Sequence, residues 1–101
     1  MKTSLIIGLD FDDTFTADPD FWIDFIDLAA RYQHRVICVS SRPHSTAHLN
    51  HLSLSLPSSV EIFLCGDVPK EEYIRHTKYG KVDIWIDDKP EFIPRNVIRI
   101  I

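Results

Sequence analysis

Short, continuous apolar runs alternate along the chain with segments in which apolar residues recur at helical spacing. We expect five strands, at about residues 4–10, 35–40, 60–65, 82–87 and 96–100, because each of these runs is rich in Val, Ile, Leu, Phe or Cys. A strand that is apolar on both faces is typical of a sheet covered by helices on both sides. The alternation of strands and helices therefore predicts βαβ units and a mainly parallel sheet.

Two helices have clear start signals. Asp18 and Pro19 form an N-cap and a first-turn proline, and apolar residues then recur at helical spacing from Phe21 to about Tyr32. Pro69 opens a second helix with two acidic residues in its first turn, and Gly80 is placed to end it.

The segment between Pro43 and Pro57 allows two interpretations. Ser45 or Thr46 can cap a short helix that runs to about His51, whereas residues 52–56 alternate leucine with serine as an extended strand does. We predict a helix followed by a loop here, and a short turn at residues 90–94 before the last strand.

Length and composition indicate one ordinary globular domain covering residues 1–101, too short for a second, substrate-binding domain. The formal net charge of −4 leaves no basic face for gripping nucleic acid by its phosphates. Nucleotides or other small phosphorylated molecules are therefore the expected partners, although the end of a nucleic acid can still enter a metal site.

Nothing in the sequence indicates a membrane or a secreted protein. The apolar runs fall short of the ~18 residues of a membrane span, and the first residues are strand-like rather than a signal peptide. Cys38 and Cys65 lie inside apolar runs without the spacing of a metal site, which favours reduced core residues and a cytoplasmic location.

Acidic residues follow two of the predicted strands. Asp10, Asp12 and Asp13 come directly after the first strand, and Asp87 and Asp88 come directly after the fourth. In an extended segment residues i and i+2 point the same way, which would direct Asp10 and Asp12 to one point. If the two strands are neighbours, these carboxylates meet at the carboxyl edge of the sheet, where open α/β folds bind ligands. Such a cluster needs a cation, and all-oxygen ligation indicates Mg²⁺.

Four motifs in chain order resemble those of the haloacid dehalogenase superfamily of aspartate-nucleophile phosphohydrolases. Asp10, Asp12 and Thr14 match its Asp-x-Asp-x-Thr motif, and Ser40 matches the Ser or Thr that ends the second strand. Lys70 is the best match for the lysine of the third motif, with Lys78, Lys81 and Lys89 as alternatives, and Asp87 and Asp88 match the acidic pair of the fourth. The position after Asp12 is Asp13, where glycine is frequent in the family.

The resemblance implies a role for each matched residue. Asp10 would be the nucleophile that forms an aspartyl-phosphate, and Asp12 the general acid and base. Asp10, the backbone carbonyl of Asp12, Asp87 and Asp88 would bind Mg²⁺. Lys70 would neutralise charge on the nucleophile and the phosphate. Thr14 and Ser40 would contact the phosphoryl oxygens. Outside the matched motifs, Ser41 is a further candidate for phosphate contact, and Arg42, which follows the serines directly, would reach a substrate phosphate or carboxylate unless it is a solvated loop residue.

The resemblance also implies a three-layer, Rossmann-like α/β sandwich with strand order 5-4-1-2-3. Only a few residues separate Asp12 from the first helix, so we expect no cap domain. The expected activity is a Mg²⁺-dependent phosphatase acting on a nucleotide, a sugar phosphate or a nucleic-acid end, with an open site or a homo-oligomer that closes it. The alternative is a binding protein that sequesters a nucleotide or signalling metabolite with little turnover.

Other side chains have both plain and functional interpretations. His44, His48 and His51 would share one helix face, as a zinc site or, more simply, as a polar surface, which can still border the site and contact substrate. Trp22 and Trp85 lie in apolar patterns and are expected in the core, whereas Phe15 is either a core residue or part of the mouth of the site.

Overall fold

The computed structural model describes residues 3–93, so the predicted strand at 96–100 lies outside the described residues. Within them the strands are β1 (Ile6–Leu9), β2 (Arg35–Ser40), β3 (Ile62–Leu64) and β4 (Ile84–Ile86). The helices are α1 (Pro19–Arg31), α2 (Thr46–Ser55) and α3 (Lys70–Arg75), with the short 3₁₀ turns η1 (Phe15–Ala17) and η2 (Pro90–Phe92). Except for β2, the strands are shorter than predicted.

The sheet of the described residues is parallel and has the order β3-β2-β1-β4, with four strands rather than the predicted five. This order contains the predicted neighbours 4-1-2-3. Leu9, at the end of β1, pairs with Cys38 of β2 on one side and with Ile86 of β4 on the other. The residues that follow β1 and β4 therefore emerge side by side at the carboxyl edge.

Helix α1 forms as the sequence predicts. The Asp18 carboxylate accepts a hydrogen bond from the backbone N–H of Phe21 at 3.3 Å, and Pro19 occupies the first turn. The helix ends at Arg31, and Gln33 then adopts a positive φ of 67°, which turns the chain into β2.

Helix α2 is longer than predicted, and the loop expected after His51 is wrong. Ser45 is the cap, since its hydroxyl accepts a hydrogen bond from the N–H of His48 at 3.1 Å. Leu52 is fully buried while Leu54 is 89% exposed, so the leucine–serine alternation belongs to a helix that packs one leucine on the sheet. The burial of Leu52 decided between the two patterns.

Helix α3 begins as predicted, directly after Pro69, but ends at Arg75 rather than near Gly80. The Thr77 hydroxyl donates to the carbonyl of Ile74 at 2.7 Å, at the turn where the helix ends. Gly80 lies in a later turn with φ of +72°, a conformation that suits glycine.

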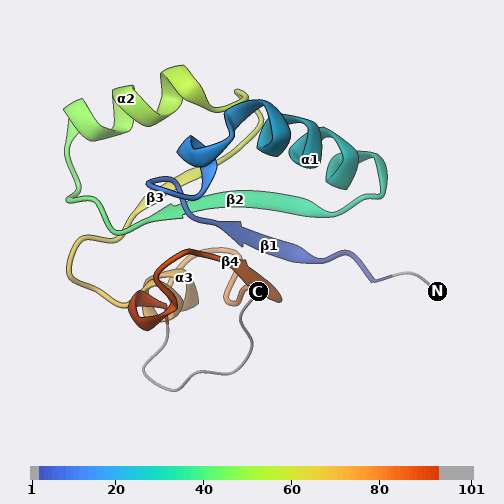
Figure 1. Ribbon diagram of the computed structural model, residues 1–101. Coiled ribbons are helices and arrows are strands. Elements are labelled where there is room, and N and C mark those ends of the chain that lie inside the picture. The colour runs from blue at the N-terminus through green and yellow to red at the C-terminus, as the bar shows by residue number, and fades with distance from the viewer. Residues whose placement is uncertain (1–2, 94–101) are drawn as a thin grey trace.

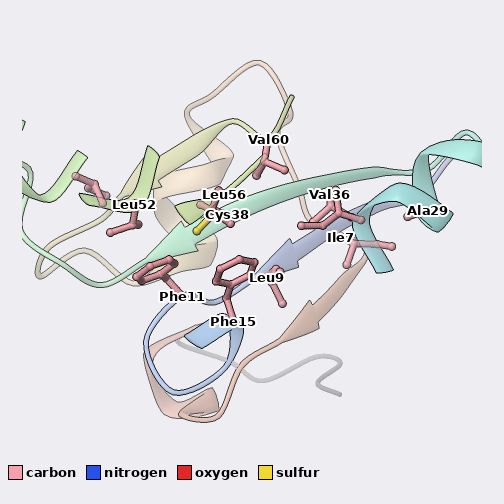
Figure 2. Packing of buried hydrophobic residues seen from close by; sticks show 12 residues of the cluster. Ile7, Leu9, Phe11, Phe15, Ala29, Val36, Cys38, Leu52, Leu56 and Val60 are labelled. Carbon is pink, nitrogen blue, oxygen red and sulfur yellow. The ribbon is translucent and has the colours of Figure 1, made fainter. Parts of the chain in front are cut away.

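The sheet is covered on both faces, which makes three layers. In Figure 1, α1 and α2 lie on one face, and α3 lies on the other. Alternate residues of β2 enter two separate clusters: Val36 and Cys38 pack under α1 and α2 (Figure 2), and Ile37 and Val39 pack on the α3 face. The architecture is α/β and is consistent with a Rossmann-like fold.

Gly8 leaves room for the Trp85 side chain of neighbouring β4 to lie over β1. A Cβ atom at this position would lie 2.9 Å from Cε3 of Trp85 and 3.2 Å from Cγ1 of Val82. Trp85 is buried, as predicted for a core residue, and its ring occupies the space that a side chain on the central strand would need.

Candidate active site

The aspartates that follow β1 and β4 meet at the carboxyl edge of the sheet. The backbone N–H of Asp10 donates to the carbonyl of Ile86 at 3.0 Å, which joins the two strand ends just before Asp87. Asp10 is 7% exposed and Asp87 is 9% exposed. Two carboxylates are therefore nearly buried side by side, a costly arrangement unless a cation lies with them.

Lys70 supplies one such cation. Its Nζ lies 2.8 Å from Oδ1 of Asp10 and 2.5 Å from Oδ2 of Asp87, and the side chain is almost completely buried. Lys70 is the first residue of α3, and the chain that leaves β3 brings it to the carboxyl edge of the sheet, beside Asp10 and Asp87. Of the lysines considered from the sequence, Lys78 and Lys81 form exposed ion pairs elsewhere. The geometry thus favours Lys70.

Thr14 connects the two acidic segments. Its hydroxyl lies 3.1 Å from Oδ2 of Asp10 and 3.2 Å from Oδ1 of Asp88, and it accepts a hydrogen bond from the N–H of Asp88. A hydroxyl has one proton, so it donates to one carboxylate at a time. Thr14 therefore orients Asp10 and Asp88, in addition to any contact with a substrate.

The charges of the cluster are strongly coupled. Burial raises the pKa of Asp10 to about 6, against the opposing effect of Lys70. Burial alone would lower the pKa of Lys70, but the carboxylates of Asp10 and Asp87 outweigh it and raise that pKa above its ordinary value. A hydrogen bond with Asp10 lowers the pKa of Asp88. The ammonium of Lys70 thus only partly compensates the acids.

These acids fit a divalent cation. Asp10, Asp87 and Asp88 each offer a carboxylate oxygen, and the three oxygens lie within 4.8 Å of one another. Three carboxylates and one lysine leave two negative charges, which one divalent ion would balance, and an all-oxygen donor set suits Mg²⁺. Such an ion would also favour the ionised form of Asp10. Asp12, predicted as a ligand through its backbone carbonyl, keeps its carboxylate outside this cluster.

Asp12 has a different partner from the other acids. Its two carboxylate oxygens accept hydrogen bonds from Nε and Nη2 of Arg42, at 2.9 and 2.8 Å. Arg42 thereby lowers the pKa of Asp12. The segment is not extended as we predicted, because the chain turns after Asp10, and Asp13 has φ of 63°. Asp10 and Asp12 still line one cleft, but a turn rather than a strand places them there.

Two of the three histidines lie against Arg42. Its Nη1 is 3.3 Å from Nδ1 of His48 and 2.9 Å from Nδ1 of His51, whereas His44 is exposed. Among residues 3–93, the groups arranged to bind a metal are aspartates, so the zinc alternative has no support. A guanidinium at the ring nitrogens is a poor neighbour for a second cation.

A cleft of about 230 Å³ opens above these groups. It is lined by Asp10, Asp12, Asp13, Ser41, Arg42, Lys70, Asp87, Asp88, Lys89 and Phe92. Ser40 is buried behind it, with its hydroxyl accepting a hydrogen bond from the N–H of Arg42 at 3.1 Å. A second hollow of about 540 Å³ adjoins it and shares Ser41 and Phe92.

Several side chains lie in the core instead of the site. Phe15 is 1% exposed and stacks on Phe11 with ring centroids 5.6 Å apart, so it does not line the mouth of the cleft. Trp22, expected in the core, is partly buried and packs against the same cluster. Cys38 and Cys65 are buried free thiols, also as predicted.

Sequence reasoning predicted that Asp10, Asp12, Asp87 and Asp88 converge and that the histidine face can border the site, but it missed the pairing of Arg42 with Asp12. The available signal was the position of Arg42 directly after the serines that end β2, together with His48 and His51 one helical turn apart on α2. Which carboxylate Arg42 would bind depends on the turn after β1, which has no clear sequence signature.

Comparison with protein-family models gave no matching family, and neither the curated proteins nor the solved structures compared with the chain gave a match. Across residues 3–93, no helix has both the length and the apolar character needed to cross a membrane. The fold and the site therefore define a class, an α/β protein with a parallel sheet and an acidic cleft at its carboxyl edge.

Proposed function

We propose that the protein is a Mg²⁺-dependent phosphohydrolase of the haloacid dehalogenase type, which cleaves phosphomonoesters through an aspartyl-phosphate. One observation carries the proposal: Lys70 joins Asp10 and Asp87 in a cleft that also contains Asp88. A nucleophile, a buried cation and further acids with ion-binding geometry are the parts that phosphoryl transfer by a carboxylate requires.

In the first step an Asp10 carboxylate oxygen attacks phosphorus. A bond forms between this oxygen and phosphorus while the bond from phosphorus to the leaving oxygen breaks. Asp12 would act in its protonated form, released from Arg42, and give its proton to that oxygen, so the product leaves as an alcohol. Asp12 lines the same cleft two residues from the nucleophile, which supports a role for it as the acid beside the point of attack rather than at it.

In the second step water attacks the phosphorus of the aspartyl-phosphate. Asp12, now ionised, takes a proton from the water, and the bond between phosphorus and the Asp10 oxygen breaks. Inorganic phosphate leaves, Asp10 is again a carboxylate and Asp12 again carries a proton. The two steps together consume one water molecule.

Lys70 keeps the nucleophile in place and offsets its charge in both steps. Asp10, Asp87 and Asp88 would hold Mg²⁺, which would screen the repulsion between the carboxylate and an anionic phosphate. Ser41 and the Ser40 segment, at the end of β2, would contact the oxygens of the phosphoryl group.

The substrate is proposed to be a phosphorylated small molecule, such as a nucleotide or sugar phosphate, or the phosphorylated end of a nucleic acid. The cleft and the adjoining hollow are open, and the segment between Asp12 and α1 is too short for a cap. Closure would then come from the substrate itself or from a second copy of the chain. The proposed setting is the cytoplasm, where phosphate esters and Mg²⁺ occur together.

A second function has one observation in its favour. Both carboxylate oxygens of Asp12 are bonded to Arg42, and this pairing lowers the pKa of the carboxyl group. A protein that sequesters a nucleotide or signalling metabolite needs the docking geometry but no free general acid. Tight, stoichiometric binding with little turnover would identify this function.

Phosphate release from a panel of phosphomonoesters, with Mg²⁺ or with EDTA, tests the proposal. We expect multiple turnovers with Mg²⁺ and a loss on the order of 10³-fold or more in Asp10→Asn, with full activity in the matched surface variant Asp24→Asn. Turnover that survives in Asp10→Asn would refute the aspartyl-phosphate route. Stoichiometric binding without release of phosphate would favour sequestration instead.

A further inference from the structure

Arg42 is the cation of the cleft that acts on Asp12 rather than on Asp10. It lies at the start of the loop after β2, and its side chain, 20% exposed, lines the same cleft as Lys70. The guanidinium carbon also lies 5.4 Å from the centroid of the Phe11 ring, so the two groups form a cation–π contact. Asp12 and the Phe11 ring thus hold Arg42 in position at the cleft.

The groups around the guanidinium leave it able to accept an anion. His48 and His51 lie at Nη1, and an imidazole carries no negative charge that could compensate the guanidinium. Among residues 3–93, Asp12 is the one carboxylate that Arg42 contacts, and that carboxylate is half exposed. Because water can solvate the half-exposed Asp12 carboxylate once it is displaced, an anionic group that enters the cleft can exchange with Asp12 at the guanidinium.

We propose that Arg42, with His48 and His51 beside it, binds a second anionic group of the substrate, so that the site prefers phosphomonoesters that also carry a phosphate or a carboxylate. This inference rests on the proposed function for the position of the reacting phosphate. A planar guanidinium matches the oxygens of either group with two parallel hydrogen bonds. When the second anion takes the guanidinium, the Asp12 oxygens are free to reach the leaving oxygen.

The position of Arg42 relative to the nucleophile sets the spacer between the two groups. Asp10 and Arg42 line one cleft, and the guanidinium contacts Asp12, two residues from the nucleophile. The preferred substrates therefore carry the second anion near the ester.

The test uses four ligands that differ in the group two carbons from the ester: ethane-1,2-diyl bisphosphate, phosphoglycolate, 2-hydroxyethyl phosphate and phosphoethanolamine. Binding is measured by calorimetry with Mg²⁺ on the Asp10→Asn protein, which would keep the ligands intact, and turnover is measured on the protein with Asp10 present. The variants are Arg42→Gln, Arg42→Lys and Lys89→Gln, and the surface control is Arg31→Gln. Thermal melting confirms that each variant is folded.

We expect the bisphosphate and phosphoglycolate to bind roughly 10-fold or more tightly than 2-hydroxyethyl phosphate. This preference should fall below 2-fold in Arg42→Gln, recover partly in Arg42→Lys, and persist in the other two variants. Comparison of the bisphosphate with phosphoglycolate shows whether the second group is a phosphate or a carboxylate.

Equal affinity for all four ligands would overturn the inference, and so would a preference that survives in Arg42→Gln, whether or not it disappears in Lys89→Gln. Failure of the proposed function looks different, because phosphate release would then be absent for every ligand while the binding preference and its dependence on Arg42 remain. If a folded Arg42→Gln protein loses affinity for all four ligands equally, Arg42 contacts the reacting phosphate instead, and the inference is wrong.

Discussion

Replacement of Lys70 by methionine tests whether this lysine compensates the buried acids. Methionine nearly matches the volume of the lysine side chain, so the change removes the charge while it keeps most of the packing. The variant leaves Asp10 and Asp87 facing each other at the edge of the sheet without their cation, 7% and 9% exposed. Breaking a buried ion pair in this way costs about 3–5 kcal/mol.

The raised pKa of Asp10 determines how the cost of Lys70→Met changes with pH. With Lys70 in place the pKa of Asp10 is already about 6, above its ordinary value of 3.8. The folded protein therefore retains a proton that the unfolded chain releases, and stability falls as the pH rises from about 4 to 6, by roughly 3 kcal/mol. Without Lys70 this pKa rises further, so the decline extends above pH 6. The cost of Lys70→Met should be larger at pH 7.5 than at pH 5.

Urea denaturation at both pH values, without metal, measures the cost. The exposed Lys78, paired with Glu61 at 3.3 Å, supplies the control, and Lys78→Met should change stability by less than about 0.5 kcal/mol. The double variant Asp10→Asn/Lys70→Met should regain about 1–2 kcal/mol at pH 7.5, because it removes one of the two facing charges. A cost below about 1 kcal/mol at pH 7.5, or the same cost at both pH values, would refute the reasoning.

Three further predictions concern the scaffold. Gly8→Ala places a methyl group 2.9 Å from the Trp85 ring, so denaturation followed by tryptophan fluorescence should show a loss of about 1–3 kcal/mol, and no loss would contradict this packing. Asp18→Ala removes the cap of α1 and should cost about 1 kcal/mol while phosphate release is unchanged; altered release would mean that α1 affects the site. Burial raises the pKa of the Cys38 thiol to about 12, so mass spectrometry should find it unalkylated by iodoacetamide at pH 8 until urea unfolds the protein.

Much of the fold follows from local pattern. The N-cap and proline at the start of α1 and the apolar run of β2 are short-range signals, and both elements lie where those signals place them. Patterns fail where two periods fit the same residues, as after His51, since only the burial of Leu52 against the sheet favours the helix. Helix α3 ends early for a related reason: Gly80 permits a turn but does not require the helix to reach it.

What the sequence determined by itself is the set of carboxylates, because aspartates placed directly after parallel strands must emerge at one edge of the sheet. Tertiary structure alone decided how these charges are paired. Lys70 reaches Asp10 across 60 positions of sequence, and Arg42 reaches Asp12 across 30. Which cation meets which acid depends on the turn after β1 and on where α3 begins relative to the sheet, and side-chain pairing over such separations is set by packing rather than by local propensity.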